Sequence, residues 1–247
     1  MSVAEKLVTI AENEQRVYDA GYEAEKQDFW DKYQNNSNPT YCKYQFAGKG
    51  WDYNTFYPKY DITPKVAQNM FQEFGRNVFF SLTERLNECG VTLDTSQCTS
   101  FQYIFYGTPF TEVPHIDTTN STALQYIYAN SNQLIKASMS IKEDGSQTWT
   151  SCFTSCSKLA DFTITSGAIG KNGFDIHWST KLSKASILSI LNACNINVIG
   201  QGISITLPKK CIDGATDTET LMSETGDADL YGASMVARSN GYTITFA

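Results

Sequence analysis

The chain repeats one pattern of hydrophobic and polar positions in two neighbouring segments. LDTSQCTSFQYIFYG at 93–107 returns 23 residues later as IDTTNSTALQYIYAN at 116–130. An Asp-Thr pair and a Gln-Tyr-Ile triplet recur at identical places, and most other pairs keep their apolar or polar character. A period of about 20–29 residues with a short aliphatic strand is typical of stacked repeat proteins, in which neighbouring units complete one another's core.

Weaker copies extend the pattern in both directions. Ser140-Ile141-Lys142 is assigned to the next strand, with the period lengthened by two residues. Thr163-Ile164-Thr165 is assigned to the strand after that. A late strand is expected at 203–207, and Ile62 with Phe71 indicates a degenerate first turn. The places of Leu124, Tyr128 and Leu134 are taken by Trp149, Phe153 and Leu159. About five turns are expected, unless the likeness is a chance match between two threonine-rich strands.

Residues 2–34 are predicted to form one helix, with Ser2 and Glu5 as a capping box. A weak heptad seam follows Val3, Leu7, Ile10, Glu14, Val17, Gly21 and Ala24. The helix either packs against the first repeat or forms a self-associating coiled coil or docking arm. The narrow apolar stripe favours the second interpretation. The candidate oligomerisation or docking residues are Val3, Leu7, Ile10, Val17 and Ala24.

An aromatic-rich segment follows the predicted helix. Its rings are Tyr41, Tyr44, Phe46, Trp51, Tyr53, Phe56, Tyr57 and Tyr60. Aromatics at this density cover the open end of a repeat stack, although a ring face also accepts the C–H face of a sugar. We therefore divide the chain into an N-terminal helix (1–38), an aromatic cap (39–90) and a repeat domain (91–247).

From about residue 183 the pattern changes to a C-terminal cap. Ser183 is expected to cap a helix whose apolar residues, Ile187 to Cys194, recur at spacings of three and four. After the strand at 203–207, a second helix is predicted over 227–239 and a last strand over 242–246. The acidic stretch at 213–229 is predicted to be an exposed loop.

The composition excludes classes of function more than it excludes classes of fold. Charged residues make up 18% of the chain and the net charge is −7, which disfavours nucleic-acid binding. No apolar run approaches the roughly 20 residues of a membrane span. The acidic, amphipathic N-terminus is unlike a signal peptide, so we expect synthesis and folding in a cytoplasm. Of the seven cysteines, Cys98 aligns with Ser121 one repeat later, which indicates reduced core thiols and not a disulfide framework.

Candidate chemistry is sparse. The two histidines, His115 and His177, lack a nearby nucleophile motif and are expected to be surface residues, with His177 facing solvent. Cys152 and Cys156 lack the further ligands of a zinc site. We predict no enzyme activity, no catalytic residue, no metal and no cofactor.

Binding is expected along the outward side of the aligned strands. In a strand of the form x-aliphatic-x the aliphatic residue points inward and its neighbours point outward. The candidate binding residues are Thr92, Asp94, His115, Asp117, Ser140, Lys142, Thr163, Thr165, Ser204 and Thr206. The face is polar and hydroxyl-rich, as suits many weak contacts to a glycan or protein, although threonine also simply favours strands.

Several segments give the chain a resemblance to a known family. They are Phe46–Trp51, Phe56–Pro64, Phe153–Cys156, Trp178–Ile187 and Gly241–Phe246. Together they resemble the BspA-like leucine-rich-repeat proteins encoded among phage and prophage structural genes of gut Firmicutes. The resemblance implies an α/β solenoid, a leucine-rich-repeat stack with an N-terminal helix and a helix-strand C-terminal cap.

For function, the resemblance implies a non-enzymatic, virion-associated protein of a tail, baseplate or fibre. Its expected partners are other virion proteins through the N-terminal helix, a bacterial surface glycan or protein, and further copies of itself. No nucleic acid and no membrane insertion are expected. The alternatives are a bacterial surface adhesin or interaction module of the same fold and, third, a carbohydrate-active enzyme. The enzyme would need a carboxylate pair, for which Asp94 and Asp117 are unconvincing.

Overall fold

The structure is a computed structural model of the chain and describes residues 46–47, 56–58, 61–75, 79–194 and 202–247. The chain divides into two units, Met1–Asn38 and Pro39–Ala247. The predicted helix at 2–34, with its candidate docking residues, lies outside the described residues. So does most of the aromatic segment. Every helix and strand that the structure describes belongs to the second unit.

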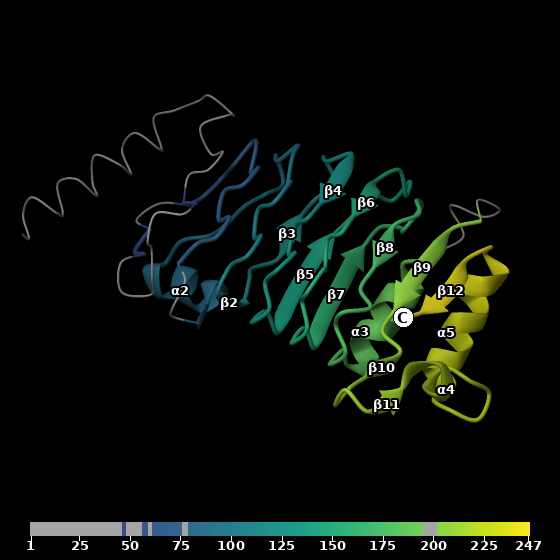
Figure 1. Cartoon of the computed structure of the whole chain (residues 1–247). Helices are drawn as coiled ribbons and strands as arrows, with labels where there is room; N and C mark the ends of the chain where they lie inside the picture. Colours follow the sequence, from purple (N-terminus) through teal and green to yellow (C-terminus); the bar gives the residue numbers. More distant parts are fainter. Residues whose placement is uncertain (1–45, 48–55, 59–60, 76–78, 195–201) are drawn as a thin grey trace, which may run out of the picture. The chain divides into compact units, whose positions relative to one another are not determined.

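The two near-identical segments lie side by side in consecutive turns of the chain (Figure 1). The backbone amides of Tyr103 and Phe105 donate to the carbonyls of Gln125 and Ile127 at 3.1 and 2.9 Å. The same ladder continues into the following turn, and an isolated parallel bridge joins Ile62 to Leu93 one turn earlier. The sequence repeat is therefore a repeat in space, and the predicted degenerate first turn is confirmed.

The first sheet is parallel and collects one short strand or strand pair from each turn. Its strands are β1 (Phe80–Ser81), β2 (Phe110–Glu112), β3 (Ile116–Asp117), β5 (Lys136–Ser140) and β7 (Asp161–Ser166). Ile116 is in register with Met139, and Met139 with Ile164. The prediction that the period lengthens by two residues, which would put Ile141 in this register, is therefore wrong. Ala137, Met139 and Ile141 are all buried, so alternation alone fits either register.

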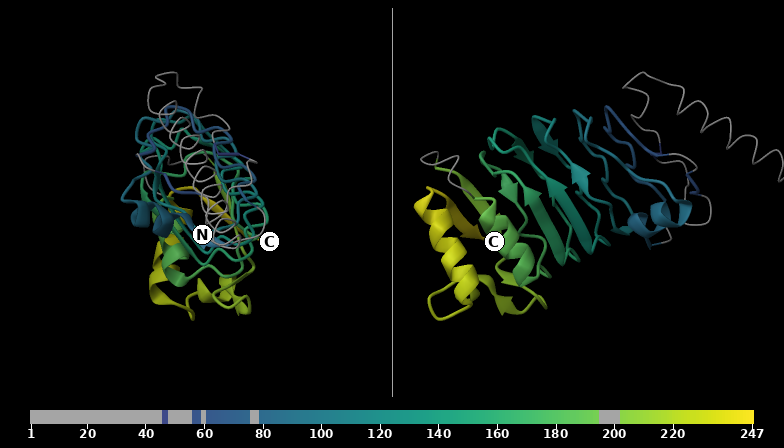
Figure 2. Two further views of the ribbon diagram at one scale, coloured as in Figure 1. Left: turned by 90° about the vertical axis from the view of Figure 1, so that its left-hand side faces the viewer. Right: turned by 180° about the vertical axis from the view of Figure 1, so that it is seen from behind.

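A second row of parallel strands forms the other side of the turns (Figure 2). It consists of β4 (Ala123–Gln125), β6 (Thr148–Thr150), β8 (Phe174–Asp175), β9 (Ser204–Leu207) and β12 (Thr243–Phe246). Here β4 pairs with β6, while β9 lies between β8 and β12. The strand predicted at 203–207 thus exists, but it does not continue the sheet that contains β7.

Helix α3 (Lys184–Asn192) takes the place where another strand would follow β7. Phe162 N donates to Ser186 Oγ at 2.8 Å, and Ile164 N donates to Ser189 Oγ at 2.9 Å. The two hydroxyls also donate to backbone carbonyls of residues 160 and 164. Two serines therefore satisfy a strand edge that would otherwise have unpaired polar groups.

The C-terminal elements mostly follow the prediction. Ser183 caps α3, α5 (Ala228–Ser239) begins after its cap Asp227, and β12 ends the chain. The stretch at 213–229 is not a simple loop. It contributes β11 (Thr216–Asp217), which pairs with β10 (Lys210–Cys211), and the short helix α4 (Thr218–Leu221). On the N-terminal side, α2 (Leu82–Cys89) ends at Gly90, whose φ is 67°.

A column of stacked aromatic rings runs through the turns. Successive centroids from Phe46 through Phe71, Phe105 and Tyr128 to Phe153 are 5.1, 5.6, 5.8 and 5.7 Å apart. All five side chains are fully buried. Offset stacking adds to the hydrophobic stabilisation of each turn. Phe153 occupies the place of Tyr128, as predicted, and Phe46 shows that part of the aromatic segment packs on the first turn.

Candidate functional site

Some of the candidate binding residues form a hydrogen-bonded cluster on the outer side of the first sheet. We call it the strand face and define it by His115, Ser138, Ser140, Thr163 and Thr165. His115 Nδ1 lies 3.1 Å from Ser138 Oγ, and its Nε2 lies 3.0 Å from Ser140 Oγ. Ser140 Oγ lies 2.9 Å from Thr165 Oγ1. The polar groups of this face therefore largely satisfy one another.

Burial lowers the pKa of His115 below its ordinary value, and the nearby carboxylate of Asp117 opposes this in part. Each ring nitrogen lies within hydrogen-bond distance of a serine hydroxyl. Because a hydroxyl both donates and accepts, either tautomer is satisfied. His115 is exposed, as predicted for a surface residue, and its ring also links the residue before β3 to β5.

Three other candidates take part in hydrogen bonds that shape turns of the chain. Thr92 donates from N and Oγ1 to Asp61 Oδ1 at 2.7 and 2.9 Å. Asp94 accepts from Ser96 N at 2.9 Å, and this hydrogen bond lowers the pKa of Asp94. Asp117 accepts from the amide and hydroxyl of Thr119. The carboxylates of Asp94 and Asp117 stabilise equivalent turns in consecutive repeats.

The remaining candidates lie away from the strand face. Lys142 follows β5, and its amide donates to Gln147 Oε1 at 2.9 Å. Ser204 and Thr206 belong to β9, in the second row of strands. Their expected alignment with Thr163 and Thr165 is wrong, because α3 replaces the next strand after β7.

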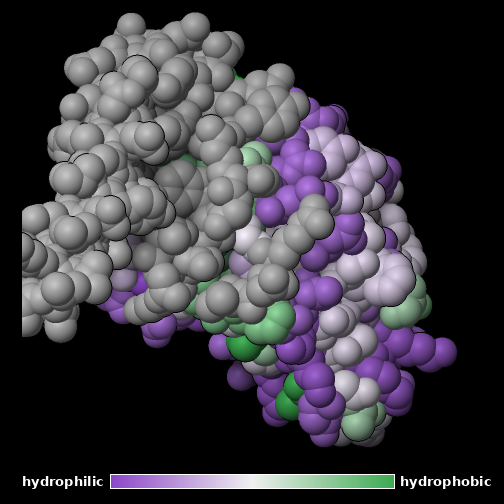
Figure 3. Space-filling model, turned by 60° about the vertical axis from the view of Figure 1, so that its left-hand side comes forward, coloured by the Kyte–Doolittle hydropathy of each residue, from purple (hydrophilic) through white to green (hydrophobic). Residues whose placement is uncertain are grey.

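The second row of strands has its own outward ladder. Gln68 Nε2 donates to Gln102 Oε1 at 3.0 Å, and Gln102 Nε2 donates to Gln125 Oε1 at 2.9 Å. Beside them the half-buried rings of Tyr103 and Tyr126 stack at 4.7 Å with planes 2° apart. Both tyrosines have positive φ, 58° and 52°. The side shown in Figure 3 is mostly hydrophilic where residues are described.

Further along this row the surface is hollowed beside Trp178. We call the hollow the Trp178 groove; its volume is about 380 Å³. It is lined by Trp149, Thr150, Ser151, Thr154, Gly173, Phe174, Asp175, Trp178, Ser204 and Thr206. The Trp178 side chain is 46% exposed, which is unusual for so large an apolar group among the described residues.

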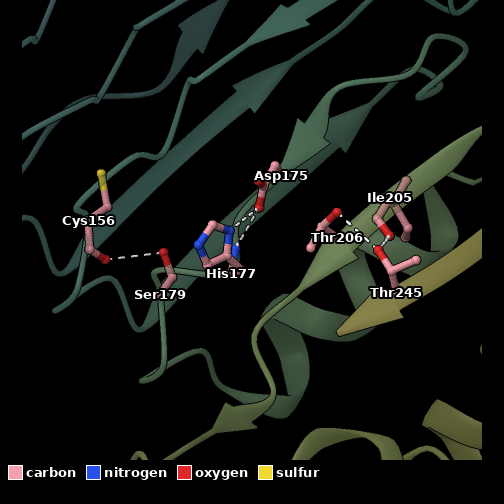
Figure 4. A network of polar contacts seen from close by, with 7 residues as sticks. All are labelled: Cys156, Asp175, His177, Ser179, Ile205, Thr206 and Thr245. Atoms are coloured by element: carbon pink, nitrogen blue, oxygen red, sulfur yellow. Dashed lines mark hydrogen bonds and ion pairs between the residues drawn. The ribbon is translucent and has the colours of Figure 1, made fainter. Parts of the chain in front are cut away.

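Hydrogen bonds within one turn and between turns surround the groove (Figure 4). Asp175 Oδ1 accepts from the amide of His177 at 3.1 Å and lies 2.6 Å from its Nδ1. On β9 and β12, Thr245 Oγ1 lies 3.0 Å from Thr206 Oγ1. Ser179, which follows Trp178, is buried and donates to Cys156 O at 3.1 Å. The turn that presents Trp178 is therefore anchored at both ends.

The sequence did not single out this groove. Phe174, Ile176 and Trp178 alternate, which predicted that His177 would face solvent and Trp178 would not. However, β8 has only two residues, and Ser179 N donates to Ile176 O at 2.9 Å, so the chain turns there. Trp178 is consequently the exposed residue and His177 is half-buried. The available signal was a tryptophan within a few residues of the end of a short strand.

No disulfide joins two of the described cysteines, and all of them except Cys89 are buried. Burial raises the pKa of the thiols of Cys152 and Cys194 to about 12 and raises that of Cys156 as well. Cys98 Sγ donates to Ser100 O as Ser121 Oγ donates to Ala123 O. The predicted equivalence of these two positions is confirmed, and such buried thiols are poor nucleophiles.

In the described part of the chain, no cluster of His, Cys, Asp and Glu side chains could hold a metal ion. The helices described there also include none that is both long and apolar enough to span a membrane.

Comparisons of the chain with protein-family models, with curated proteins and with solved structures found no match.

Proposed function

We propose that this chain is a non-enzymatic repeat protein whose turns form a solenoid similar to the BspA-like leucine-rich-repeat stacks. One observation supports this above all: segments with near-identical sequence pair in parallel, turn upon turn, between 93–107 and 116–130. Such a stack offers extended outer sides made of short strands. Extended sides suit adhesion through several weak contacts better than they suit catalysis.

We further propose that the protein is virion-associated, as part of a tail, baseplate or fibre. The segments that resemble phage-encoded repeat proteins support this placement. In this proposal the N-terminal helix attaches the protein to other virion proteins or to further copies of itself. The stacked turns then face a bacterial surface glycan or protein.

A lysine substitution on the outer surface of the strand face tests whether this face binds cells. Thr163 is exposed, its side chain makes no hydrogen bond to the described residues, and it lies opposite Ser138. We expect Thr163→Lys to weaken binding of the purified protein to host cells about tenfold, which corresponds to about 1.4 kcal/mol. Flow cytometry with the labelled protein measures this.

Thr148→Lys is the matched control, because Thr148 is likewise an exposed strand threonine but belongs to β6 in the second row. It should bind cells as the unchanged protein does. Equal binding by Thr163→Lys and the unchanged protein would exclude the strand face. Absence of cell binding by the unchanged protein would remove the adhesion proposal itself.

A further inference from the structure

We propose that the Trp178 groove binds one unit of an uncharged saccharide. This site lies on the second row of strands, apart from the strand face, and it does not depend on where the protein resides. The groove draws its lining from three consecutive turns, at β6, β8 and β9. Its volume of about 380 Å³ lies near the lower end of the usual range for small-molecule pockets.

An exposed indole provides the apolar surface that a sugar ring needs. Trp178 is 46% exposed, while His177 lies beside it with ring centroids 4.9 Å apart. The hydrogen bonds of Asp175 and Ser179 fix the turn on either side of it. A rigid aromatic plate loses little conformational entropy on binding. A pyranose ring has a face rich in C–H groups, which can stack on such a plate.

Uncommitted hydroxyls around the indole provide the polar complement. The side-chain hydroxyls of Thr150, Ser151, Thr154 and Ser204 make no hydrogen bond to the described residues. Trp149 also lines the groove, and its Nε1–H is buried without a partner in the described part of the chain. Buried donors normally find a partner. A ligand with many hydroxyl groups would meet several free donors and acceptors here.

The strand face differs in this respect. There, His115, Ser138, Ser140 and Thr165 are hydrogen-bonded to one another. A single sugar would have to replace these bonds to reach the same groups. The hollow between β7 and α3 is similar in size, about 400 Å³, but the Ser189 hydroxyl in its lining is committed to the backbone of Ile164. The free polar groups therefore favour the Trp178 groove over these two surfaces as a site for a saccharide.

Charge selects the class of saccharide. Among the residues that line the groove, Asp175 is the one charged side chain. Its Oδ1 is occupied by His177, while Oδ2 has no hydrogen bond to the described residues. A free carboxylate oxygen accepts hydrogen bonds from sugar hydroxyls and repels carboxylated or sulfated sugars. The geometry therefore points to a neutral hexose or N-acetylhexosamine.

The test uses the full chain, labelled with ¹⁵N, and follows the indole N–H resonance of Trp178. Trp178→Phe identifies this resonance by its disappearance. The probes are hexasaccharides of glucose (α- and β-linked), of mannose and of N-acetylglucosamine, with a hyaluronan hexasaccharide as the acidic comparison. We expect at least one neutral probe to shift the resonance in a saturable way and the acidic probe to cause no shift.

Variants then assign the contacts, with binding measured by ligand-observed saturation transfer. Trp178→Ala should weaken binding at least about tenfold, the loss of about 1.4 kcal/mol of contact free energy, and Trp178→Phe should weaken it less. Phe79→Ala, which removes another exposed aromatic ring, is the matched control and should have no effect. Asp175→Asn keeps an acceptor for the His177 amide and should allow the acidic probe to bind.

The proposal is overturned if no neutral probe shifts the Trp178 resonance at millimolar concentration. It is equally overturned if Trp178→Ala binds as well as the unchanged protein. Neither result bears on the strand face, which is tested separately by Thr163→Lys in cell binding. The two proposals can therefore fail independently.

Discussion

At the scale of single residues, hydrogen bonds between side chains set what each outer surface can do. His115, the residue before β3, is held to β5 through Ser138 and Ser140, and partial burial lowers the pKa of its ring. An unfolded chain has an ordinary histidine pKa of about 6.5 and takes up a proton first as the pH falls. Below about pH 6.5 the unfolded state therefore binds more protons, and the folded state loses stability.

We expect His115→Gln to reduce the loss of stability between pH 7.5 and pH 5.5, because glutamine keeps polar contacts but does not titrate. The measurement is the free energy of unfolding from urea titrations at both pH values. At pH 7.5 the histidine is neutral in the folded and unfolded states, so its titration does not contribute to the free energy of unfolding. The same pH dependence in both proteins would show that His115 is not the group responsible.

At the scale of elements, close backbone approaches hold the turns together. Gly167 follows β7 with φ of 99°, and a Cβ on it would lie 2.1 Å from the carbonyl oxygen of Ile141. Only glycine accepts both the conformation and the distance. This approach places the end of β7 against the preceding turn, just before the chain continues towards β8.

We expect Gly167→Ala to lower the free energy of unfolding by about 2–4 kcal/mol, because the chain must shift to relieve the clash. Gly232→Ala is the matched control. Gly232 lies within α5, where an added Cβ would meet nothing within 4 Å, so alanine should stabilise the protein by about 0.5–1 kcal/mol. Urea denaturation of both variants checks the pair. A neutral effect of Gly167→Ala would mean that the two turns are less tightly packed than the structure shows.

At the scale of the whole molecule, the N-terminal helix predicted at 2–34 provides a seam for self-association. The predicted seam contains Leu7 and Ile10, while Lys6 lies off it. If the helix forms a coiled coil, the intact chain sediments as an oligomer and Leu7→Asp with Ile10→Asp sediments as a monomer. Lys6→Asp should leave the oligomer intact. A monomeric intact chain would remove the coiled coil and leave the helix as a packing or docking element.

Much of the repeat region could be predicted from the sequence. The duplicated segments, the places of Phe153 and Leu159, the cap at Ser183 and the helix after Asp227 follow from local patterns that near neighbours in sequence determine. The register of β5 could not be predicted. Ala137, Met139 and Ile141 fit an inward-facing alternation equally well, and only pairing with Ile116 and Ile164 selects Met139.

The sequence by itself determined that near-identical turns exist, which residues point into their shared core and that the surface is polar and weakly acidic. These follow from side-chain chemistry and from a period that is independent of the surroundings. Only the tertiary structure decided that α3 ends the first sheet, that Ser204 and Thr206 belong to another row, and that Trp178 stands beside free hydroxyls. Each of these depends on contacts between residues far apart in the chain, where packing and backbone hydrogen bonding outweigh local preference.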